Sequence, residues 1–294
     1  MTGKDEENQT RGTVAREETT LATLSEPDRT EPDPTEPDLP RERTGGRAHV
    51  VLPAFNEEAS LPPLLHRLAD VARTEQVTVW VVDDGSADAT VAVAEAGYGG
   101  LDVRVVRHLV NLGLGRAVQS GLRAALEAAS PDDIVVVMDA DDTHDPSLIR
   151  ALHAEITAGA DVAICSRFVP GGDDRTAPFG RRLLSRGAAQ LFHRALDVDG
   201  VRDFTSGYRA YRASLLARAS AHWGERLIEE QGFACMVELL LKLRHCRPVI
   251  TEVPLALRYD RKQGPSKLKL RRTVVQYLKL LARDRLSPAP YRKL

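Results

Sequence analysis

Between residues 48 and 166 the chain alternates short, mostly apolar runs with longer segments in which apolar residues recur at helical spacing. The runs are too short for helices, and their lack of polar alternation is typical of strands covered on both faces. We expect strands over residues 49–54, 77–82, 103–107, 134–138 and 162–165, with helices between them. This alternation predicts an α/β fold with a mostly parallel, doubly wound sheet flanked by helices.

The pattern changes after Arg167. We expect a helix rich in arginine near residues 181–194, a second helix over residues 232–243 and a last strand over residues 249–253. Residues 268–286 form a basic amphipathic helix, because apolar positions recur at helical spacing among Lys and Arg. We expect this helix to pack on the core. Contact with an anionic membrane surface is the alternative, since such helices lie in the interface plane.

The composition is that of a soluble chain with one catalytic domain: 43% of its 294 residues are apolar and 28% are charged. No apolar run approaches the roughly 18 residues that a bilayer-spanning helix needs, and no signal peptide is recognisable. Three cysteines, Cys165, Cys235 and Cys246, show no metal-ligand spacing and leave an odd thiol. We therefore expect a cytoplasmic protein, with the 268–286 helix as its candidate contact with a membrane face.

Charge divides the chain unevenly. Residues 1–46 hold 12 Asp and Glu against 6 Lys and Arg, so that the net charge of −2 conceals a basic remainder. This arm repeats Glu-Pro-Asp at a five-residue period and has almost nothing apolar to bury, which predicts disorder. We therefore expect three parts: the acidic arm 1–46, a catalytic domain 47–267, and a C-terminal helix and tail 268–294. No nucleic-acid partner is expected.

The strand expected at residues 134–138 ends in Asp139, Ala140 and Asp141. Since residues i and i+2 of a strand point the same way, both carboxylates can project from its carboxyl end, where open α/β sheets bind ligands. Two adjacent carboxylates repel each other unless a cation lies between them. Mg²⁺ or Mn²⁺, which take oxygen ligands and share one or two carboxylates with substrate phosphates, fit this arrangement. A solvated acidic loop is the alternative.

The glycines near residue 113 exclude two nucleotide-binding classes. Gly113 and Gly115 are not followed by the third glycine of a dinucleotide fingerprint, since that position is Val118. The chain also lacks the G-x-x-x-x-G-K-[ST] pattern of a P-loop. Neither an NAD enzyme nor a P-loop NTPase is supported.

Seven motifs in order resemble the family 2 glycosyltransferases of the GT-A fold, and among them the dolichyl/polyprenyl-phosphate mannose synthase branch. The motifs are LPAFNE (52–57), VVDDGS (81–86), NLGLG (111–115), MDAD (138–141), SRFVPGG (166–172), DFTSGYR (203–209) and GPSK (264–267). The resemblance covers roughly residues 48–270, and the acidic arm lies outside it. It implies an inverting, metal-dependent transfer of a sugar, mannose from GDP-mannose, to a polyprenyl phosphate.

The resemblance also assigns residues. Asp139 and Asp141 would hold the metal against the donor diphosphate and, with Arg167, form the catalytic set. The acceptor phosphate would be held by Arg167, Arg181 and Ser185, because guanidinium groups suit phosphate oxygens bidentately. The nucleotide sugar would contact Pro53, Phe55, Glu57, Asp83, Asp84, Gly113, Ala140, Arg258 and Lys267. A phosphate monoester, with a second pKa near about 6, is already an anionic nucleophile at neutral pH and needs no general base.

Three departures keep other functions open. Met236 stands where the family commonly has Gln, and residues 142–143 are not its usual apolar and amide pair. The branch usually carries a membrane segment or recruits an anchoring partner, whereas this chain has only the 268–286 helix. A transferase that uses a UDP-sugar and a soluble hydroxyl acceptor would need a base, for which Asp203 and Glu238 are the candidates. A regulatory module that binds nucleotide sugars without turnover is the non-enzyme alternative.

Overall fold

The computed structural model describes residues 46–196, 198–262 and 270–286. Apart from Gly46, the acidic arm predicted for residues 1–46 lies outside these ranges. Lys267 and the motif at residues 264–267 lie outside them as well.

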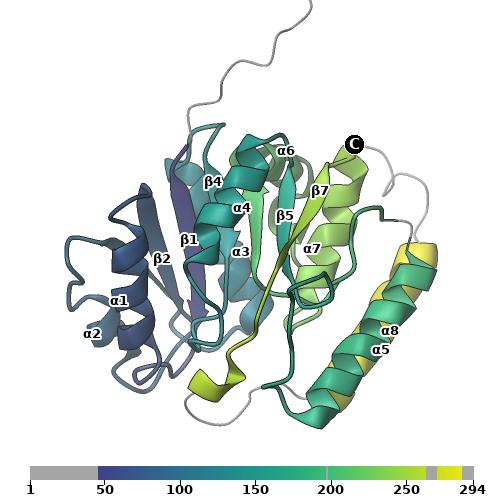
Figure 1. The fold of residues 1–294 in the computed structure, drawn as a ribbon, viewed down its shortest axis with the longest axis horizontal. Helices are drawn as coiled ribbons and strands as arrows, with labels where there is room; N and C mark the ends of the chain where they lie inside the picture. The colour runs from purple at the N-terminus through teal and green to yellow at the C-terminus, as the bar shows by residue number, and fades with distance from the viewer. Residues whose placement is uncertain (1–45, 197, 263–269, 287–294) are drawn as a thin grey trace, which may run out of the picture. The chain divides into compact units, whose positions relative to one another are not determined.

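The core of the fold is one seven-stranded sheet with the order β3-β2-β1-β4-β6-β5-β7 (Figure 1). Its strands are β1 (Ala48–Ala54), β2 (Val77–Asp83), β3 (Asp102–Arg107), β4 (Ile134–Val137), β5 (Val162–Ser166), β6 (Arg209–Arg212) and β7 (Ile250–Pro254). Strands β3, β2, β1 and β4 pair in parallel, as do β5 and β7. The predicted mostly parallel α/β sheet is thereby confirmed, with all six expected strands present.

Strand β6 was not foreseen. It lies between β4 and β5 and pairs antiparallel with both, where the sequence indicated only a polar turn entering further structure. Its four residues include Arg209 and Arg212, so neither an apolar run nor an alternating pattern marks the strand. Arg209 is fully buried, and its guanidinium donates to the carbonyl oxygens of Phe204 and Met236 at 2.7 Å each. These hydrogen bonds give both terminal nitrogens of the buried guanidinium an acceptor, which makes an arginine tolerable within the sheet.

Helices cover both faces of the sheet because alternate strand residues point to opposite sides. On one face Val50 and Val81 pack with α1 (Leu61–Val71), α2 (Thr90–Ala94) and α4 (Leu148–Thr157). On the other, Val51 and Val82 pack with α3 (Leu114–Ala128), α6 (Ala213–Trp223) and α7 (Cys235–Leu243). Three short 3₁₀ helices, η1 (Gly224–Arg226), η2 (Arg244–Cys246) and η3 (Tyr259–Arg261), complete the connections.

Two long helices, α5 (Phe179–Ala195) and α8 (Leu270–Leu286), run side by side next to the sheet (Figure 1). The rings of Phe192 on α5 and Tyr277 on α8 meet edge to face at 5.0 Å between centroids. Tyr277, Leu280 and Leu281 are buried, so one face of α8 packs on the core as predicted. Among the described residues no helix is long and apolar enough to cross a bilayer.

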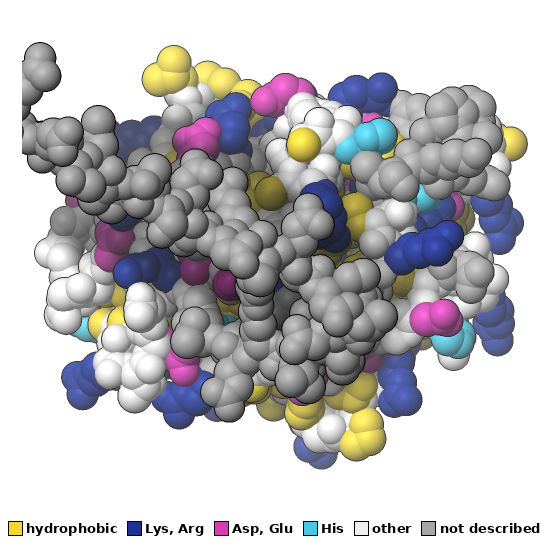
Figure 2. Space-filling view, turned by 90° about the horizontal axis from the view of Figure 1, so that it is seen from above, with side chains coloured by type: hydrophobic (Ala, Val, Ile, Leu, Met, Phe, Trp, Pro, Cys, Tyr) yellow, Lys and Arg dark blue, Asp and Glu magenta, His cyan; other side chains and the backbone are white. Residues whose placement is uncertain are grey.

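Charges of both signs share the surface. Figure 2 shows the face seen from above in Figure 1, where Lys and Arg side chains lie in separate groups with Asp and Glu side chains between several of them. The coloured side chains of this face therefore form no single basic patch of the kind that tracks a nucleic-acid backbone.

Candidate active site

The candidate site lies at the carboxyl ends of β1, β2 and β4. The chain runs outward from β1 to β2 and β3 and then returns to place β4 on the other side of β1, so the direction of winding reverses between β1 and β4. Open α/β sheets bind ligands at such a reversal. Asp84 follows β2, while Asp139 and Asp141 follow β4, so the fold brings the expected acidic residues to this one edge.

A cleft of about 630 Å³ opens at this edge, within the size range of small-molecule sites. Nine of the residues expected to contact substrates line it: Pro53, Phe55, Glu57, Asp84, Gly113, Asp139, Ala140, Asp141 and Arg181. A smaller recess of about 40 Å³ is lined by Asp139, His144, Arg167 and Arg181, among others. Asp139 and Arg181 line both spaces, so the carboxylate pair adjoins the predicted acceptor arginines.

The carboxylate of Asp141 is held from both sides. One oxygen accepts a hydrogen bond from the Thr143 hydroxyl at 2.7 Å, and the other forms an ion pair with the ammonium group of Lys262. Burial alone would raise the pKa of Asp141, but the Lys262 charge and these hydrogen bonds outweigh it and lower the pKa below its ordinary value. Asp141 is therefore ionised at neutral pH and has a cation beside it.

A neutral histidine orients Asp139. The backbone N–H of Asp139 donates to Nδ1 of His144 at 3.1 Å, which places the ring proton on Nε2, 3.9 Å from a carboxylate oxygen of Asp139. Burial lowers the pKa of His144, so the ring stays neutral at pH 7, and it stacks on Tyr208 with centroids 5.0 Å apart. The ring fixes the backbone from which the Asp139 carboxylate projects toward the cleft.

These two carboxylates fit a divalent cation that is shared with substrate. Among residues 46–196, 198–262 and 270–286, no group of three or more His, Cys, Asp or Glu could form an all-protein metal cage. Mg²⁺ is usually bound by only one or two carboxylates and completes its shell with waters and substrate phosphates. The ammonium of Lys262 on Asp141 shows that the site accepts positive charge.

The glycine motif before α3 has a packing role. Gly113 has φ +93°, and a Cβ there would lie 2.7 Å from the carbonyl oxygen of Gln231. A Cβ on Gly115 would lie 1.7 Å from the carbonyl oxygen of Glu230. Only glycine permits this approach. The segment before α7 therefore packs directly against the start of α3, and Gln231 joins Gly113 in the wall of the cleft.

Asp84 anchors the loop that carries this motif. Its carboxylate accepts hydrogen bonds from the backbone N–H groups of Leu112 at 2.9 Å and Gly113 at 2.8 Å, and it contacts His108 at 2.8 Å. The second ring nitrogen of His108 contacts the Ser120 hydroxyl at 2.9 Å. Asp84 thus shapes the wall of the cleft as well as facing into it.

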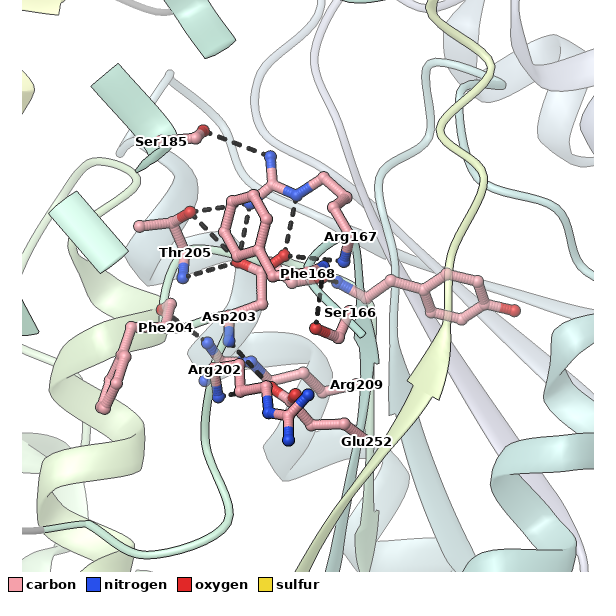
Figure 3. A network of polar contacts seen from close by, with 12 residues as sticks. Ser166, Arg167, Phe168, Ser185, Arg202, Asp203, Phe204, Thr205, Arg209 and Glu252 are labelled. Carbon is pink, nitrogen blue, oxygen red and sulfur yellow. Dashed lines mark hydrogen bonds and ion pairs between the residues drawn. The ribbon is translucent and has the colours of Figure 1, made fainter. Parts of the chain in front are cut away.

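Arg167 is engaged by a buried carboxylate (Figure 3). Its Nε and Nη2 donate to the two oxygens of Asp203 at 2.8 and 2.7 Å, and Nη2 also donates to the Thr205 hydroxyl at 2.7 Å. Nη1 donates to the Ser185 hydroxyl at 3.2 Å. The structure therefore brings Arg167 and Ser185 together as expected. Two of the three guanidinium nitrogens donate to Asp203, a partner that the sequence did not reveal.

Asp203 is unsuited to act as a general base. Its exposed fraction is 0%, and it also accepts from the backbone N–H groups of Arg167 and Thr205. Burial alone would raise its pKa, but the charge of Arg167 and these hydrogen bonds outweigh it and lower the pKa. The expectation that Asp203 could serve as a base for a hydroxyl acceptor is wrong in this structure, because its proton-accepting oxygens are occupied.

Comparison with known proteins identifies the family. Residues 49–219 match the family model described as Glycosyl transferase family 2. The chain belongs to glycosyl transferase family 2. This membership confirms the resemblance and the predicted enzyme class, a glycosyltransferase.

Two curated relatives carry narrower names. The polyprenol monophosphomannose synthase of Mycolicibacterium smegmatis is 34% identical over 224 residues, 76% of this chain and 81% of the relative. The undecaprenyl-phosphate mannosyltransferase of Micrococcus luteus is 34% identical over 223 residues, 76% of this chain and 87% of the relative.

The solved structures include glucosyl-3-phosphoglycerate synthase from Mycobacterium tuberculosis. One of its structures contains Mg²⁺ and UDP and has a TM-score of 0.58 to this chain. Another contains Mn²⁺, UDP-glucose and phosphoglyceric acid and has a TM-score of 0.57. Both are 25% identical and cover 81% of this chain and 80% of the solved one.

Glu238, the other candidate base of this glycosyltransferase, has a structural role. It is 1% exposed, and one oxygen accepts from the backbone N–H groups of Glu229 and Glu230 at 2.9 and 2.8 Å. The other oxygen forms ion pairs with Lys242 at 3.0 Å and Arg283 of α8 at 2.6 Å. As with Asp203, these contacts leave it unsuited to activate an acceptor.

Two of the expected donor residues, Asp83 and Arg258, are not among the described residues that line the cleft. Asp83 is buried at the end of β2, where it accepts a hydrogen bond from the backbone N–H of Ser86 at 3.1 Å. The side chain of Arg258 is 43% exposed and forms an ion pair with Asp260 at 2.7 Å. Lys267 lies outside the described residues.

Several residues of the cleft wall were not expected from the sequence. Lys262, which reaches Asp141, stands one residue after η3 and carries no local signal beyond its place in the loop after the last strand. Helix α8 contributes Arg272, Thr273 and Gln276 to the wall. The sequence signal that could have indicated them is that they are polar residues on an otherwise amphipathic helix.

Proposed function

We propose that this glycosyltransferase moves mannose from GDP-mannose to a polyprenyl phosphate with inversion at the anomeric carbon. The observation that carries the proposal is the position of Arg181, which lines both the cleft of the carboxylate pair and the adjoining recess of Arg167. A cation there can face a phosphate acceptor while the sugar donor occupies the cleft. The two curated relatives named above support the choice of sugar and acceptor.

The donor would occupy the larger cleft. Phe55, Glu57 and Asp84 would hold the nucleoside, since carboxylates accept hydrogen bonds from ring N–H groups and sugar hydroxyls. Pro53, Gly113 and Ala140 would border it with little side-chain bulk. Asp83 would act indirectly, through the loop after β2 that its carboxylate holds. Arg258 and Lys267 would contact the diphosphate.

Asp139 and Asp141 would hold Mg²⁺ or Mn²⁺. When bound, the cation would neutralise negative charge that develops on the departing nucleoside diphosphate. Lys262 would leave Asp141 as the metal and the diphosphate arrive. The M. tuberculosis structures that contain Mg²⁺ or Mn²⁺ with UDP support a divalent ion in this fold.

The acceptor phosphate would lie between Arg181 and the outer edge of Arg167. Arg181 stacks over the Tyr259 ring with its Cζ 5.3 Å from the ring centroid. Arg167 would contribute its charge while Asp203, Thr205 and Ser185 fix its orientation. The reaction forms a bond from an acceptor phosphate oxygen to the anomeric carbon and breaks the bond from that carbon to the diphosphate. An anionic phosphate needs no general base. This agrees with the structure, in which Asp203 and Glu238 are buried and paired with cations and are therefore unsuited to act as bases.

Replacing Arg181 with alanine is expected to raise the KM for the acceptor about 10- to 100-fold while changing the KM for the donor much less. A charge-assisted hydrogen bond to phosphate contributes about 1.5–3 kcal/mol, which sets this range. Steady-state kinetics with each substrate varied in turn would measure it. Arg182→Ala is the matched control, because that neighbouring side chain faces Asp174 at 3.6 Å. Equal losses for donor and acceptor would instead assign Arg181 to the diphosphate.

The proposed reaction can be tested with four incubations. The purified protein with Mn²⁺ would receive GDP-mannose or UDP-glucose, each with and without polyprenyl phosphate, and both released nucleoside diphosphate and lipid-linked sugar would be measured. The expected result is lipid-dependent release from GDP-mannose alone. Donor release with no lipid-linked product would refute the proposed acceptor, and no release from either donor, with or without lipid, would favour the regulatory module.

A second function is favoured by one observation. The M. tuberculosis enzyme was solved with UDP-glucose and phosphoglyceric acid, which is a soluble acceptor. Transfer from a UDP-sugar to a soluble acceptor is therefore the alternative reaction. Turnover of UDP-glucose that increases on addition of phosphoglyceric acid, and not of lipid phosphate, would establish it.

A lipid acceptor also requires contact with a membrane. We propose that helix α8, the described part of the basic 268–286 segment, rests on the cytoplasmic membrane face. Val275 and Leu278 are 49% and 53% exposed, and Arg271 and Lys279 are exposed beside them. Sedimentation with anionic and neutral vesicles would test this contact, since attraction to anionic lipid weakens with salt.

A further inference from the structure

The segment before α7, residues 229–233, forms part of the cleft wall. Gln231, Gly232 and Phe233 line the cleft, and Phe233 also lines the adjoining recess. Residues 229–233 belong to no helix or strand, so no regular backbone ladder holds them. The shape of this wall therefore depends on contacts that other parts of the chain make with the segment.

The buried carboxylate of Glu238 holds the start of the segment. One of its oxygens accepts hydrogen bonds from the backbone N–H groups of Glu229 and Glu230 at 2.9 and 2.8 Å. Hydrogen bonds to an ionised group are stronger than those between neutral groups. Because Gln231 follows directly in the chain, Glu238 fixes the point at which the segment enters the cleft wall.

The second oxygen of Glu238 connects the same carboxylate to α8. It pairs with Lys242, one turn further along α7, at 3.0 Å and with Arg283 of α8 at 2.6 Å. Another nitrogen of Arg283 lies 3.9 Å from a carboxylate oxygen of Glu230. Glu238 is 1% exposed, so salt screens these pairs only weakly. One buried carboxylate thus joins the wall segment, α7 and α8.

Helix α8 meets the wall segment a second time, inside the cleft. Thr273 and Gln276 of α8 line the cleft, and a Cβ on Gly232 would lie 2.8 Å from the side-chain oxygen of Gln276. Arg283 follows Gln276 by seven residues, about two turns, and so lies on the same side of the helix. Helix α8 therefore contacts the segment at one end by packing and at the other by charge.

The charges of this cluster do more than stabilise a packed interface. An apolar contact of the same size is often as stable as a buried ion pair, because burying the ions costs free energy of desolvation. Glu238 differs from an apolar residue in that it binds backbone N–H groups with one oxygen and α8 with the other. The pair therefore fixes the position of the wall segment relative to α8.

We propose that Glu238 is a positioning residue for the sugar donor, through which the position of α8 sets the geometry of the cleft wall. The proposal rests on the proposed function, because it concerns the cleft assigned to the donor. Contact between Arg283 and Glu238 keeps Gln231 and Gly232 against Gln276, so that the two sides of the wall face the donor together. Displacing α8 from Glu238 weakens donor binding without touching the acceptor arginines.

Replacing Arg283 with methionine tests the link from the α8 side. Methionine removes the charge, Glu238 keeps Lys242 as a partner, and the Arg283 side chain is 43% exposed, so the fold is expected to be retained. Donor affinity would be measured by calorimetric titration of GDP-mannose and UDP-glucose with Mn²⁺, and the acceptor KM and kcat by steady-state kinetics. The donor Kd is expected to rise at least about fivefold, the lower limit of typical couplings between linked sites. The acceptor KM and kcat should stay unchanged.

Two further variants serve as controls. Arg285→Met removes the same charge from the same last turn of α8, at an exposed position, and should leave the donor Kd at the wild-type value. Arg283→Lys keeps a charge that can reach Glu238, and since one nitrogen of Arg283 makes the 2.6 Å contact, it should recover most of the loss. A role in packing alone would give no such recovery. An unchanged Kd in Arg283→Met, an equal rise in Arg285→Met, or no recovery in Arg283→Lys would overturn the proposal.

A measurement without substrate separates this proposal from the proposed function. Amide hydrogen exchange of residues 229–233 would be followed by mass spectrometry in the absence of nucleotide. Exchange is expected to be faster in Arg283→Met and unchanged in Arg285→Met, because the amides of Glu229 and Glu230 donate to Glu238. This result would uphold the link between α8 and the cleft wall even if both donors proved wrong. Equal exchange in the wild type and Arg283→Met would overturn it, whichever donor the enzyme uses.

Discussion

Replacing Asp141 with alanine is expected to abolish metal-dependent donor binding and to lower turnover about 10²- to 10³-fold. The variant removes one of the two carboxylates at the end of β4 and leaves Lys262 and Thr143 without their shared acceptor. Lewis-acid stabilisation by a bound metal contributes several kcal/mol to the transition state, and about 1.4 kcal/mol corresponds to a factor of ten. Calorimetric titration of GDP-mannose with and without Mn²⁺, together with the rate of nucleoside diphosphate release, would measure both effects.

The neighbouring carboxylate provides the control. Asp142 pairs with Arg67 of α1 and has φ +64°, a conformation that asparagine tolerates. Asp142→Asn should therefore keep Mn²⁺-dependent donor binding. Retention of Mn²⁺-stimulated turnover in Asp141→Ala would refute the assignment of Asp141 as a metal ligand. Similar losses of donor binding in Asp141→Ala and Asp142→Asn would indicate that the substitutions disrupt the loop.

Replacing Asp203 with alanine is expected to lower the free energy of unfolding by about 3–5 kcal/mol. The change leaves the Arg167 guanidinium, which is 8% exposed, without its paired carboxylate, and a buried charge that loses its partner is strongly destabilising. Urea denaturation would measure the loss. The control is Asp173→Ala, since Asp173 forms a surface pair with Arg175 and such pairs contribute about 0–1 kcal/mol.

The same variant distinguishes a structural carboxylate from a general base. If Asp203 were a general base, Asp203→Ala would lower turnover and leave the free energy of unfolding unchanged. If Asp203 is instead the partner of a buried charge, the variant loses stability, and an apolar double variant, Arg167→Met with Asp203→Leu, recovers part of that loss. Since the pKa of Asp203 is lowered on folding, its stabilisation is present above the ordinary carboxyl pKa, near about 4. It declines as pH falls below that value through the folded pKa. The stability difference between wild type and Asp203→Ala should narrow accordingly below about pH 4.

The sequence predicted the carboxylate pair well and its surroundings poorly. Asp139 and Asp141 follow a strand whose apolar run is visible locally, and strand geometry alone sends both toward the carboxyl edge. Lys262 lies 121 residues from Asp141, and nothing in the loop after β7 indicates that it returns to this carboxylate. Arg167 was predicted to hold the acceptor phosphate, but its pairing with Asp203, 36 positions away in the chain, was not predicted.

The sequence by itself determined the α/β class, the strands of the sheet with local apolar runs, the acidic edge and the family motifs. Each of these depends on periodicity or on residues close together in the chain, where backbone geometry limits the outcomes. Only the tertiary structure decided that β6 enters the sheet antiparallel, that Asp203 and Glu238 serve buried cations, and that α8 joins the wall of the cleft. These features join distant segments, and their free energy comes from burial and charge pairing that exist only after the chain has folded.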